Sequence, residues 1–520
     1  MSSDRLRKWD ELMNVPVESE GRPGADLDTI GQLIDLSADL DREPGLLRAL
    51  EHIEALRSAG PGEHDHLLLD YFEGNARFEL HALSPSESPA LERPQLEKAI
   101  ISYRRARLSL PSEKLGKIQT CQMLTNLANA LSTLGRTVEA IELWDEALHL
   151  EPSFGMAIGN RGCGLWYLAG VDSDPGHASL IAHAANRDLT AALALPLEEG
   201  AREHFLAAQR SIEQRVDREF LQSAPDYSSF GLGDSDEEIA YRRWALEERL
   251  FLNTLNDLRG HSIAATDPLC LPGIVVPLSE GPYYIGFYNQ MKQEYASARY
   301  QLFSGLHSDQ PHFSDRHVTI VNTLDYPSCS LSTELEKMAF RVAYSLLDKV
   351  AFFLNHYLAL GIEEHLVSFR KVWFKEGGPE EGLRPGVCLA DNYGLLGLYW
   401  LSKDFYERSP DYASNLQPDA REVACIRNHL EHRYLKLHLD LWPGPVASSE
   451  GDGLADTLAL SLTRAAFRLK ALRLMKSARA ALIYLSHAVG TEERRRRRVA
   501  GEDRPVGRGH LDVWEDEWKV

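Results

Sequence analysis

Residues 422–441 hold the side chains of this chain that are best suited to chemistry, in the sequence EVACIRNHLEHRYLKLHLDL. Arg427 precedes His432 by five positions, and Asn428 lies between them. A histidine titrates near neutral pH, so it can remove a proton from a ribose 2′-hydroxyl or protonate a leaving 5′-oxygen. An arginine can stabilise the charge that builds up on phosphate oxygens through its planar set of N–H donors. These residue types support RNA cleavage by the RNA's own 2′-hydroxyl, which needs no metal ion and no cofactor.

A helix through this stretch would separate an apolar stripe from the polar side chains. Asn428 and His432 are i, i+4 neighbours on the opposite side, so the amide could fix the orientation of the imidazole. Arg427 lies about 140° round the helix from His432, and only a shared phosphate could bridge that separation. One histidine cannot easily be both acid and base, but two copies of the chain across a dimer interface could divide the work. The apolar stripe is predicted to contain Val423, Ile426, Leu430, Tyr434, Leu437 and Leu441.

The residues alone favour a plainer interpretation of the same helix. A charged outward face is ordinary, and Arg427 and Glu431 can form a routine i, i+4 ion pair. A zinc site at His429, Glu431 and His432 is not expected, because the i, i+4 histidine pair of metalloproteases is absent. The loop at residues 307–317 contains histidines and aspartates in a spacing that matches no metal motif, so no metal site is predicted there.

Helical hairpins are predicted for the N-terminal half. Residues 121–154 form a 34-residue unit, CQMLTNLANALSTLGRTVEAIELWDEALHLEPSF, that breaks at Gly135 and has the tetratricopeptide (TPR) pattern. The pattern recurs upstream and downstream, so we expect a TPR-like α-solenoid at residues 61–225 after a degenerate helical cap at 1–60. Such an array presents a concave groove, which is predicted to bind a protein partner. The unit's inward-facing residues are Leu124, Leu127, Ala128, Leu131, Ala140, Trp144 and Ala147.

A second helical domain should follow a connector. Residues 266–284 contain four prolines and two glycines, which favour an extended join. We therefore expect a helical connector and join at 226–285, a helical bundle at 286–490, and a basic then acidic tail at 491–520. The whole chain is predicted to be all-α. The predicted helices of the bundle are 288–303, 332–360 with a capping box at Thr333 and Glu336, 389–406, 418–440 and 453–489.

The segment Arg427-Asn428-His429-Leu430-Glu431-His432 resembles the Arg-x4–6-His motif of HEPN domains. HEPN domains are all-α bundles, and many are metal-independent ribonucleases of toxin–antitoxin, CRISPR and anti-phage systems. Over residues 240–490 the chain is similar to bacterial proteins that join N-terminal TPRs to a C-terminal HEPN domain. The resemblance implies that Arg427 and His432 are the catalytic pair, that Asn428 supports them, and that the chain forms a homodimer or higher homo-oligomer. It implies a toxin or anti-phage effector; the alternative is a non-catalytic scaffold that binds a protein partner or RNA.

Tyr434 allows two interpretations. Arg427-x4-His432-x-Tyr434 resembles the extended motif of HEPN toxins that are paired with small nucleotidyltransferases, in which the tyrosine is adenylylated. On the helical wheel, however, Tyr434 falls in the apolar stripe, which favours a core position over a modification site.

Charge and composition limit the partners. The chain has 520 residues, 44% of them hydrophobic, and a net charge of −21, which excludes a disordered chain and argues against a protein that coats DNA or membranes. Residues 464–498 are an exception to the overall negative charge, because they contain eleven basic residues and two acidic ones. RNA could bind there, and tRNA is one candidate. A solvated, flexible segment is the alternative for the arginine run, and the acidic residues 510–520 could fold back to mask it. The RNA-binding candidates are Arg464, Arg468, Lys476, Arg479, Arg494, Arg495, Arg496, Arg497 and Arg498.

Other sequence features concern location. No apolar run reaches the roughly 18 residues that a membrane helix needs, and no export signal is visible at the N-terminus. The six cysteines are dispersed, as expected for reduced thiols in a cytoplasmic protein. No helix-turn-helix signature is present, so no specific DNA partner and no membrane partner are expected.

Overall fold

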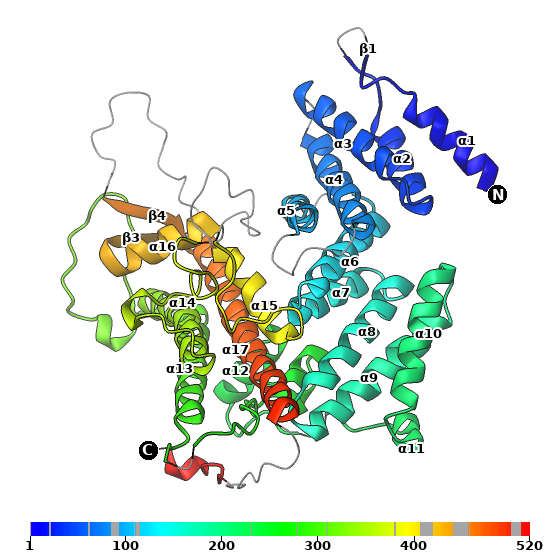
Figure 1. Cartoon of the computed structure of the whole chain (residues 1–520). Helices are drawn as coiled ribbons and strands as arrows, with labels where there is room; N and C mark the ends of the chain where they lie inside the picture. The colour runs from blue at the N-terminus through cyan, green and yellow to red at the C-terminus, as the bar shows by residue number, and fades with distance from the viewer. Residues whose placement is uncertain are drawn as a thin grey trace.

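The computed structural model describes residues 2–19, 22–60, 63–84, 93–108, 110, 115–228, 230–277, 279–308, 310–378, 381–405, 420–439, 456, 458–500 and 511–519. The described chain is overwhelmingly helical, as the sequence predicts, and its strands form two short pairs (Figure 1). The N-terminal helix α1 (Ser2–Met13) precedes a minimal hairpin of β1 (Glu18–Ser19) and β2 (Arg22–Pro23). None of the helices in the described ranges is both long enough and apolar enough to cross a membrane.

Consecutive helices then pack in pairs to form what we call the helical array (Figure 1). A small core of its own holds the first three helices together, whereas the later helices share one core with the C-terminal half. The array consists of α2 (Leu27–Asp39), α3 (Glu43–Ser58), α4 (Glu63–Leu83), α5 (Pro94–Leu108), α6 (Lys117–Thr133), α7 (Thr137–Leu150), α8 (Gly155–Val171), α9 (Pro175–Leu193) and α10 (Glu199–Glu213).

The predicted 34-residue unit is confirmed as the hairpin of α6 and α7. Leu124, Leu127, Leu131 and Trp144 are buried, and the Trp144 indole N–H donates to Asn129 Oδ1 at 3.1 Å. The hairpin turns at Gly135, whose φ of 76° lies in the left-handed region. A Cβ at this position would lie 2.6 Å from the carbonyl oxygen of Tyr393, so glycine is needed both for the turn and for the approach of the C-terminal half.

The join is extended, as predicted: the described residues between Thr266 and Pro282 contain no helix. It follows α11 (Arg218–Gln222), α12 (Asp236–Glu247) and the 3₁₀ turns η1 (Thr254–Leu258) and η2 (Ser262–Ala264). The C-terminal domain, as we name α13 to α17, contains α13 (Tyr283–Leu306), α14 (Leu331–Tyr357), α15 (Tyr393–Ser402), η6 (Lys403–Phe405), α16 (Ala420–His432), β3 (Tyr434–His438), β4 (Ala459–Thr463) and α17 (Arg464–Ala500).

Three predicted helices of this domain have the wrong bounds. The helix predicted at 418–440 ends at His432, because residues 434–438 continue as a strand that pairs in parallel with β4. The helix predicted at 453–489 begins only at Arg464 and continues to Ala500, so a domain boundary at residue 490 would cut α17. The helix predicted at 389–406 is α15 followed by η6, and residue 406 lies outside the described residues.

The predicted capping box of the long helix is also wrong. Helix α14 begins earlier, and its cap is Ser330, whose side chain accepts from the Thr333 backbone N–H. Glu336 is fully buried and accepts instead from arginines of α17. A buried carboxylate needs a cationic partner, which explains why it does not reach back to the helix terminus.

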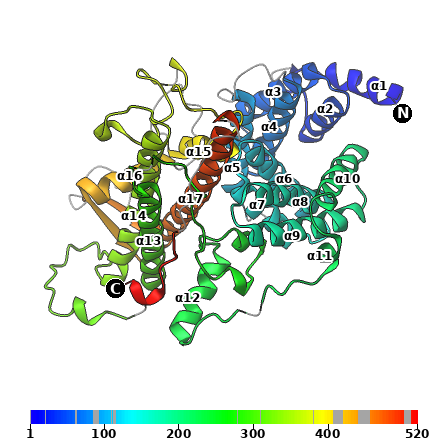
Figure 2. The ribbon, with the colours of Figure 1, turned by 60° about the horizontal axis from the view of Figure 1, so that its bottom comes forward.

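Helix α17 lies between the helical array and the rest of the C-terminal domain (Figures 1 and 2). The Tyr484 hydroxyl accepts from the Val138 backbone N–H at 3.0 Å and donates to Glu139. Asp404 of η6 pairs with Arg104 of α5 and with Arg136 before α7, each at 2.8 Å. The helical array is therefore joined to the C-terminal domain by buried polar contacts as well as by a shared apolar core.

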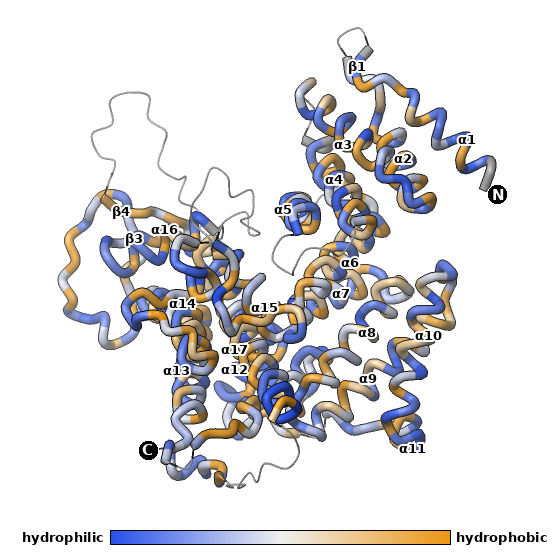
Figure 3. Tube along the Cα trace, viewed as in Figure 1, coloured by the Kyte–Doolittle hydropathy of each residue, from blue (hydrophilic) through white to orange (hydrophobic). Residues whose placement is uncertain are grey.

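The link between α13 and α14 stands away from this core. Val318, Ile320 and Val321 are 59–81% exposed in an extended stretch that Figure 3 shows as an orange segment of an outlying loop. Its far end is fixed to the domain, because the Ser328 backbone N–H donates to the Leu437 carbonyl at 2.6 Å.

Candidate active site

Helix α16 carries the predicted catalytic residues on a well-packed support. Val423, Ile426 and Leu430 are buried by 95% or more, which confirms the first half of the predicted apolar stripe, and α16 packs against α14. Arg341 of α14 donates to the Leu430 carbonyl near the end of the helix. A helix end leaves its last carbonyls without intrahelical donors, so this arginine stabilises the end that bears His432.

Arg427 is half-buried and held in place by two neighbours. Its guanidinium carbon lies 5.5 Å from the centroid of the Tyr344 ring, and its Nη1 donates to Asn428 Oδ1 at 3.2 Å. Burial raises the pKa of nearby Asp348, although the Phe369 backbone N–H and the positive charge of Arg427 oppose that rise. The aromatic face and the amide leave part of the guanidinium fork available for a phosphate.

His432 is exposed at the last position of α16. Its imidazole makes no hydrogen bond and no ion pair within the described part of the chain. Asn428 is exposed as well, but its amide oxygen accepts from Arg427 and does not orient His432 as predicted. The predicted Arg427–Glu431 ion pair is also wrong, since Glu431 lies 4.0 Å from Nε of Arg341.

Tyr434 does not lie in the apolar stripe, which is a second consequence of α16 ending early. It opens strand β3, is 43% exposed, and donates its hydroxyl proton to Asp456. The hydrogen bond to that carboxylate raises the pKa of Tyr434. Lys436 completes the cluster with Nζ–O distances of 2.7 Å to both Asp325 and Asp456. The core position favoured for Tyr434 is thus wrong, and the tyrosine is exposed beside the candidate site.

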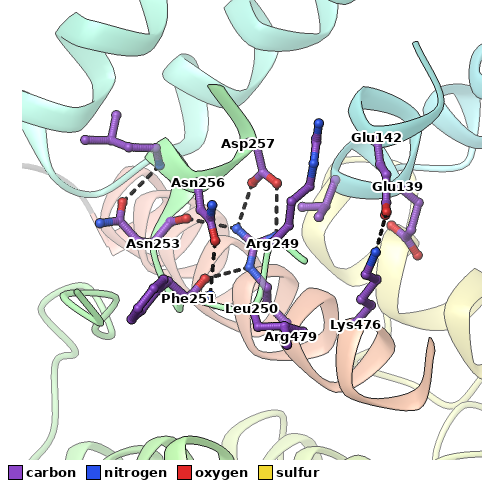
Figure 4. A network of polar contacts seen from close by, with 12 residues as sticks. Glu139, Glu142, Arg249, Leu250, Phe251, Asn253, Asn256, Asp257, Lys476 and Arg479 are labelled. Carbon is purple, nitrogen blue, oxygen red and sulfur yellow. Dashed lines mark hydrogen bonds and ion pairs between the residues drawn. The ribbon is translucent and has the colours of Figure 1, made fainter. Parts of the chain in front are cut away.

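Basic residues in the first half of α17 form ion pairs with other helices of the chain. Arg464 and Arg468 both donate to Oε1 of the buried Glu336, at 2.7 and 2.9 Å. Lys476 reaches Glu142 of α7 at 2.7 Å (Figure 4). Of the RNA-binding candidates Arg464, Arg468 and Lys476, each therefore has an acidic partner in the folded chain.

The prediction that Arg479 contacts RNA is wrong. It is 2% exposed, and its guanidinium donates to both carboxylate oxygens of Asp257 and to the carbonyls of Phe251 and Asn253 (Figure 4). An RNA phosphate cannot reach it without disrupting this network, so Arg479 is removed from the RNA-binding candidates.

The five-arginine run is helical and forms the last turns of α17, so it is not a flexible tail segment. Arg495 and Arg496 pair with Glu492 at 2.7 and 2.9 Å, whereas Arg494 and Arg498 are exposed. Arg497 donates to the Gly273 carbonyl at 3.1 Å. Thirty residues of continuous helix separate Arg464 from Arg494, which is about 45 Å. An RNA that contacts both the run and α16 must span most of the domain.

Two further segments singled out in the sequence are the histidine-rich loop at residues 307–317 and the acidic tail. In the histidine-rich loop, Asp309 lies outside the described residues, while Asp315 caps α14 by accepting from the Leu331 backbone N–H at 2.9 Å. Where the structure is described, no group of three His, Cys, Asp or Glu side chains is placed to hold a metal ion. In the acidic tail, the Lys519–Asp516 ion pair at 2.5 Å lies within the tail itself. Residues 501–510, which connect this tail to α17, lie outside the described residues.

One family model matches part of the chain. Residues 275–492 match a family model described as LA2681-like HEPN, which supports a HEPN domain in the C-terminal half. This range includes α16 and most of α17, but not the helical array. No curated protein and no solved structure matches the chain.

Proposed function

We propose that the chain is a metal-independent endoribonuclease of the HEPN type, in which His432 and Arg427 act on the scissile phosphate. The observation that carries the proposal is the contrast between these two residues on α16, within the matched range. Arg427 is fixed by Tyr344 and Asn428, whereas His432 is exposed and without a protein partner in the described chain. A phosphate-holding group should be fixed, and a proton-transfer group must be open to the substrate.

The chemistry follows from these positions. The ribose 2′-oxygen attacks the adjacent phosphorus and loses its proton to a neutral imidazole, while the bond from phosphorus to the 5′-oxygen breaks. An imidazolium gives its proton to the leaving 5′-oxygen. The products are a 2′,3′-cyclic phosphate and a 5′-hydroxyl. Arg427 stabilises the extra negative charge on the phosphorane oxygens. Because His429 is hydrogen-bonded to the Cys425 carbonyl and His432 alone is exposed on α16, we propose that His432 of a second copy provides the other imidazole.

The helical array would control this activity. Its hairpins are coupled to the C-terminal domain through Asp404, Tyr484 and Lys476, so a protein bound to the array can bias the position of α17. We propose that such a partner restrains or releases the ribonuclease in a toxin or anti-phage role, with RNA such as tRNA as substrate.

A non-catalytic scaffold is the second candidate. It is favoured by one observation: Arg464, Arg468 and Arg479 are committed to buried carboxylates and not to a free surface. In that case the C-terminal domain would serve only to bind a protein partner, because these arginines are not available to RNA.

The deciding experiment is an assay on total RNA and on purified tRNA in excess EDTA, with the full chain. His432→Ala and Arg427→Ala should abolish cleavage. Matched controls are His429→Gln and Arg433→Ala on the same stretch, because the His429 ring is bonded to the Cys425 carbonyl at 2.8 Å and Arg433 is exposed. Activity that survives both site variants would refute the assignment, and a wild type that never cleaves would favour the scaffold.

A further inference from the structure

An unpaired segment with the composition of a β-strand links α13 to α14. Residues 316–324 are exposed throughout, and Figure 3 shows their apolar stretch in orange on the outside of the molecule. Five of the six residues 318–323, VTIVNT, are β-branched, a side-chain type that favours extended backbone. Within the described chain, the backbone groups of residues 319–323 make no hydrogen bond to another segment. The proposed ribonuclease chemistry makes no use of this segment.

Both ends of the segment are fixed to the C-terminal domain. At its start, the Asp315 carboxylate accepts from the Leu331 backbone N–H at 2.9 Å, where α14 begins. At its end, Asp325 pairs with Lys436 of β3 at 2.7 Å, and the Asp325 carbonyl lies 3.1 Å from Nδ1 of His438. A segment that is already extended and held at both ends loses less conformational freedom when another strand pairs with it.

The exposed surface of the segment is apolar and carries no protecting charge. Its two valines and its isoleucine are 59–81% exposed, and the apolar surface continues over Leu324 and Tyr326, which are 63% and 73% exposed. Native proteins usually cover an unpaired strand or place charged side chains along it, but residues 318–324 contain none. We therefore expect another strand to cover this segment.

The charges at the two ends favour a second copy of the same segment as that strand. Arg316 stands at the start, without an ion pair in the described chain, and Asp325 stands at the end. An antiparallel pair with its two-fold axis between Ile320 and Val321 places Arg316 opposite the partner subunit's Asp325. The same register places Ile320 opposite the partner subunit's Val321, a pairing of β-branched side chains that stabilises sheets. A parallel pair would instead bring like charges together.

We propose that residues 316–325 of two copies pair as antiparallel strands and form a homodimer contact. The inference deepens the proposed function and rests on it for the use of the dimer, because cleavage there requires His432 of a second copy. The fixed end of the segment is bonded to β3, which begins two residues after His432. The contact thus joins the two copies on the part of the domain that carries the candidate active site.

Analytical ultracentrifugation of the full chain tests the contact. Wild type should form a dimer with a dissociation constant of about 10 μM or lower. Ile320→Lys should raise that constant at least about tenfold, because it places a charge opposite the partner subunit's Val321. Leu366→Lys is the matched control and should leave the constant unchanged, since Leu366 is an apolar residue, 55% exposed, outside the segment.

A charge reversal tests the antiparallel register. Arg316→Glu and Asp325→Lys should each weaken the dimer by about tenfold, because each puts like charges opposite one another at two symmetric positions. The double variant should return to within about threefold of wild type. Lys436 keeps Asp456 as a partner at 2.7 Å in these variants.

Three results would overturn the inference. They are a wild type that stays monomeric up to about 100 μM, a dimer that Ile320→Lys leaves unchanged, and a double charge variant as weak as the single ones. Circular dichroism of each variant shows whether it folds, and the charge series decides if Ile320→Lys does not. The assay of RNA cleavage in EDTA separates this inference from the proposed function. A monomeric wild type that cuts RNA would refute the contact alone, whereas a dimer with the expected variant effects that never cuts RNA would uphold the contact and refute the ribonuclease.

Discussion

Replacing Arg479 by methionine should destabilise the protein strongly without acting through RNA. The guanidinium is 2% exposed and donates to Asp257 Oδ1 and Oδ2 at 2.9 and 3.0 Å, to the Phe251 carbonyl at 2.6 Å and to the Asn253 carbonyl at 2.9 Å (Figure 4). Asp257 is itself fully buried, so the substitution leaves an uncompensated carboxylate in the interior. Breaking a buried pair in this way costs about 3–5 kcal/mol.

Urea unfolding of the full chain, followed by circular dichroism and tryptophan fluorescence, measures this loss. The double variant Arg479→Met, Asp257→Asn removes the stranded charge as well, so it should recover about 2 kcal/mol relative to the single variant. Arg494→Met is the matched control on the same helix, because Arg494 is exposed and its substitution should change the free energy of unfolding by about 0.5 kcal/mol or less.

The reasoning would be refuted by a variant that unfolds like wild type. If Arg479→Met changed the free energy of unfolding by less than about 1 kcal/mol yet weakened RNA binding, Arg479 would contact RNA and would not stabilise the fold. A double variant no more stable than the single one would show that the buried charge of Asp257 is not the source of the loss.

Gly135→Ala should lower the free energy of unfolding by on the order of 2 kcal/mol in thermal unfolding, because φ is 76° and the new Cβ would clash with the Tyr393 carbonyl. Gly170→Ala is the control: this glycine lies in open space within α8, so its substitution should be neutral or stabilising. Equal effects at both glycines would contradict the prediction. Burial lowers the pKa of His487 to about 4. The unfolded chain then binds more protons, so stability should fall by up to about 3 kcal/mol as pH drops from about 6.5 to 4, and His487→Gln should flatten that part of the pH profile. A profile identical in wild type and variant would contradict it. Arg494→Gln with Arg498→Gln should make the dependence of log K for RNA on log salt less steep by about 1.4, two contacts at about 0.7 each; an unchanged slope would remove the arginine run from the RNA surface.

The sequence predicts those features that depend on local patterning. Leucines at i, i+3 and i+7 specify α6, and Gly135 marks the turn to α7, so this hairpin is where the pattern indicated. The placement of Arg427 and His432 on one helix follows from the same reasoning. The period of two in Leu435 and Leu437 is a strand signal, and the helical period of residues 423–432 does not continue beyond His432.

Partners that are distant in sequence could not be predicted. Strand β3 is completed by β4, whose first residue pairs with Tyr434 from 25 positions away, and parallel pairing of this kind leaves no local signal. The basic residues of α17 look alike in the sequence. Only the fold separates Arg479, bonded to Asp257 from 222 positions away, from the exposed Arg494 and Arg498. The aromatic support of Arg427 by Tyr344 likewise depends on how α14 packs against α16.

The most direct test of the central claim is to ask whether the RNA's own 2′-hydroxyl is the nucleophile and His432 its proton acceptor or donor. A cleaved RNA is mapped to a single site, and that site is then resynthesised with one 2′-O-methyl group. We predict that wild type in EDTA cuts the unmodified RNA to 2′,3′-cyclic phosphate ends, leaves the methylated site intact, and loses all cleavage in His432→Ala. Cleavage at the methylated site, or fragments with 5′-phosphate ends, would contradict the account.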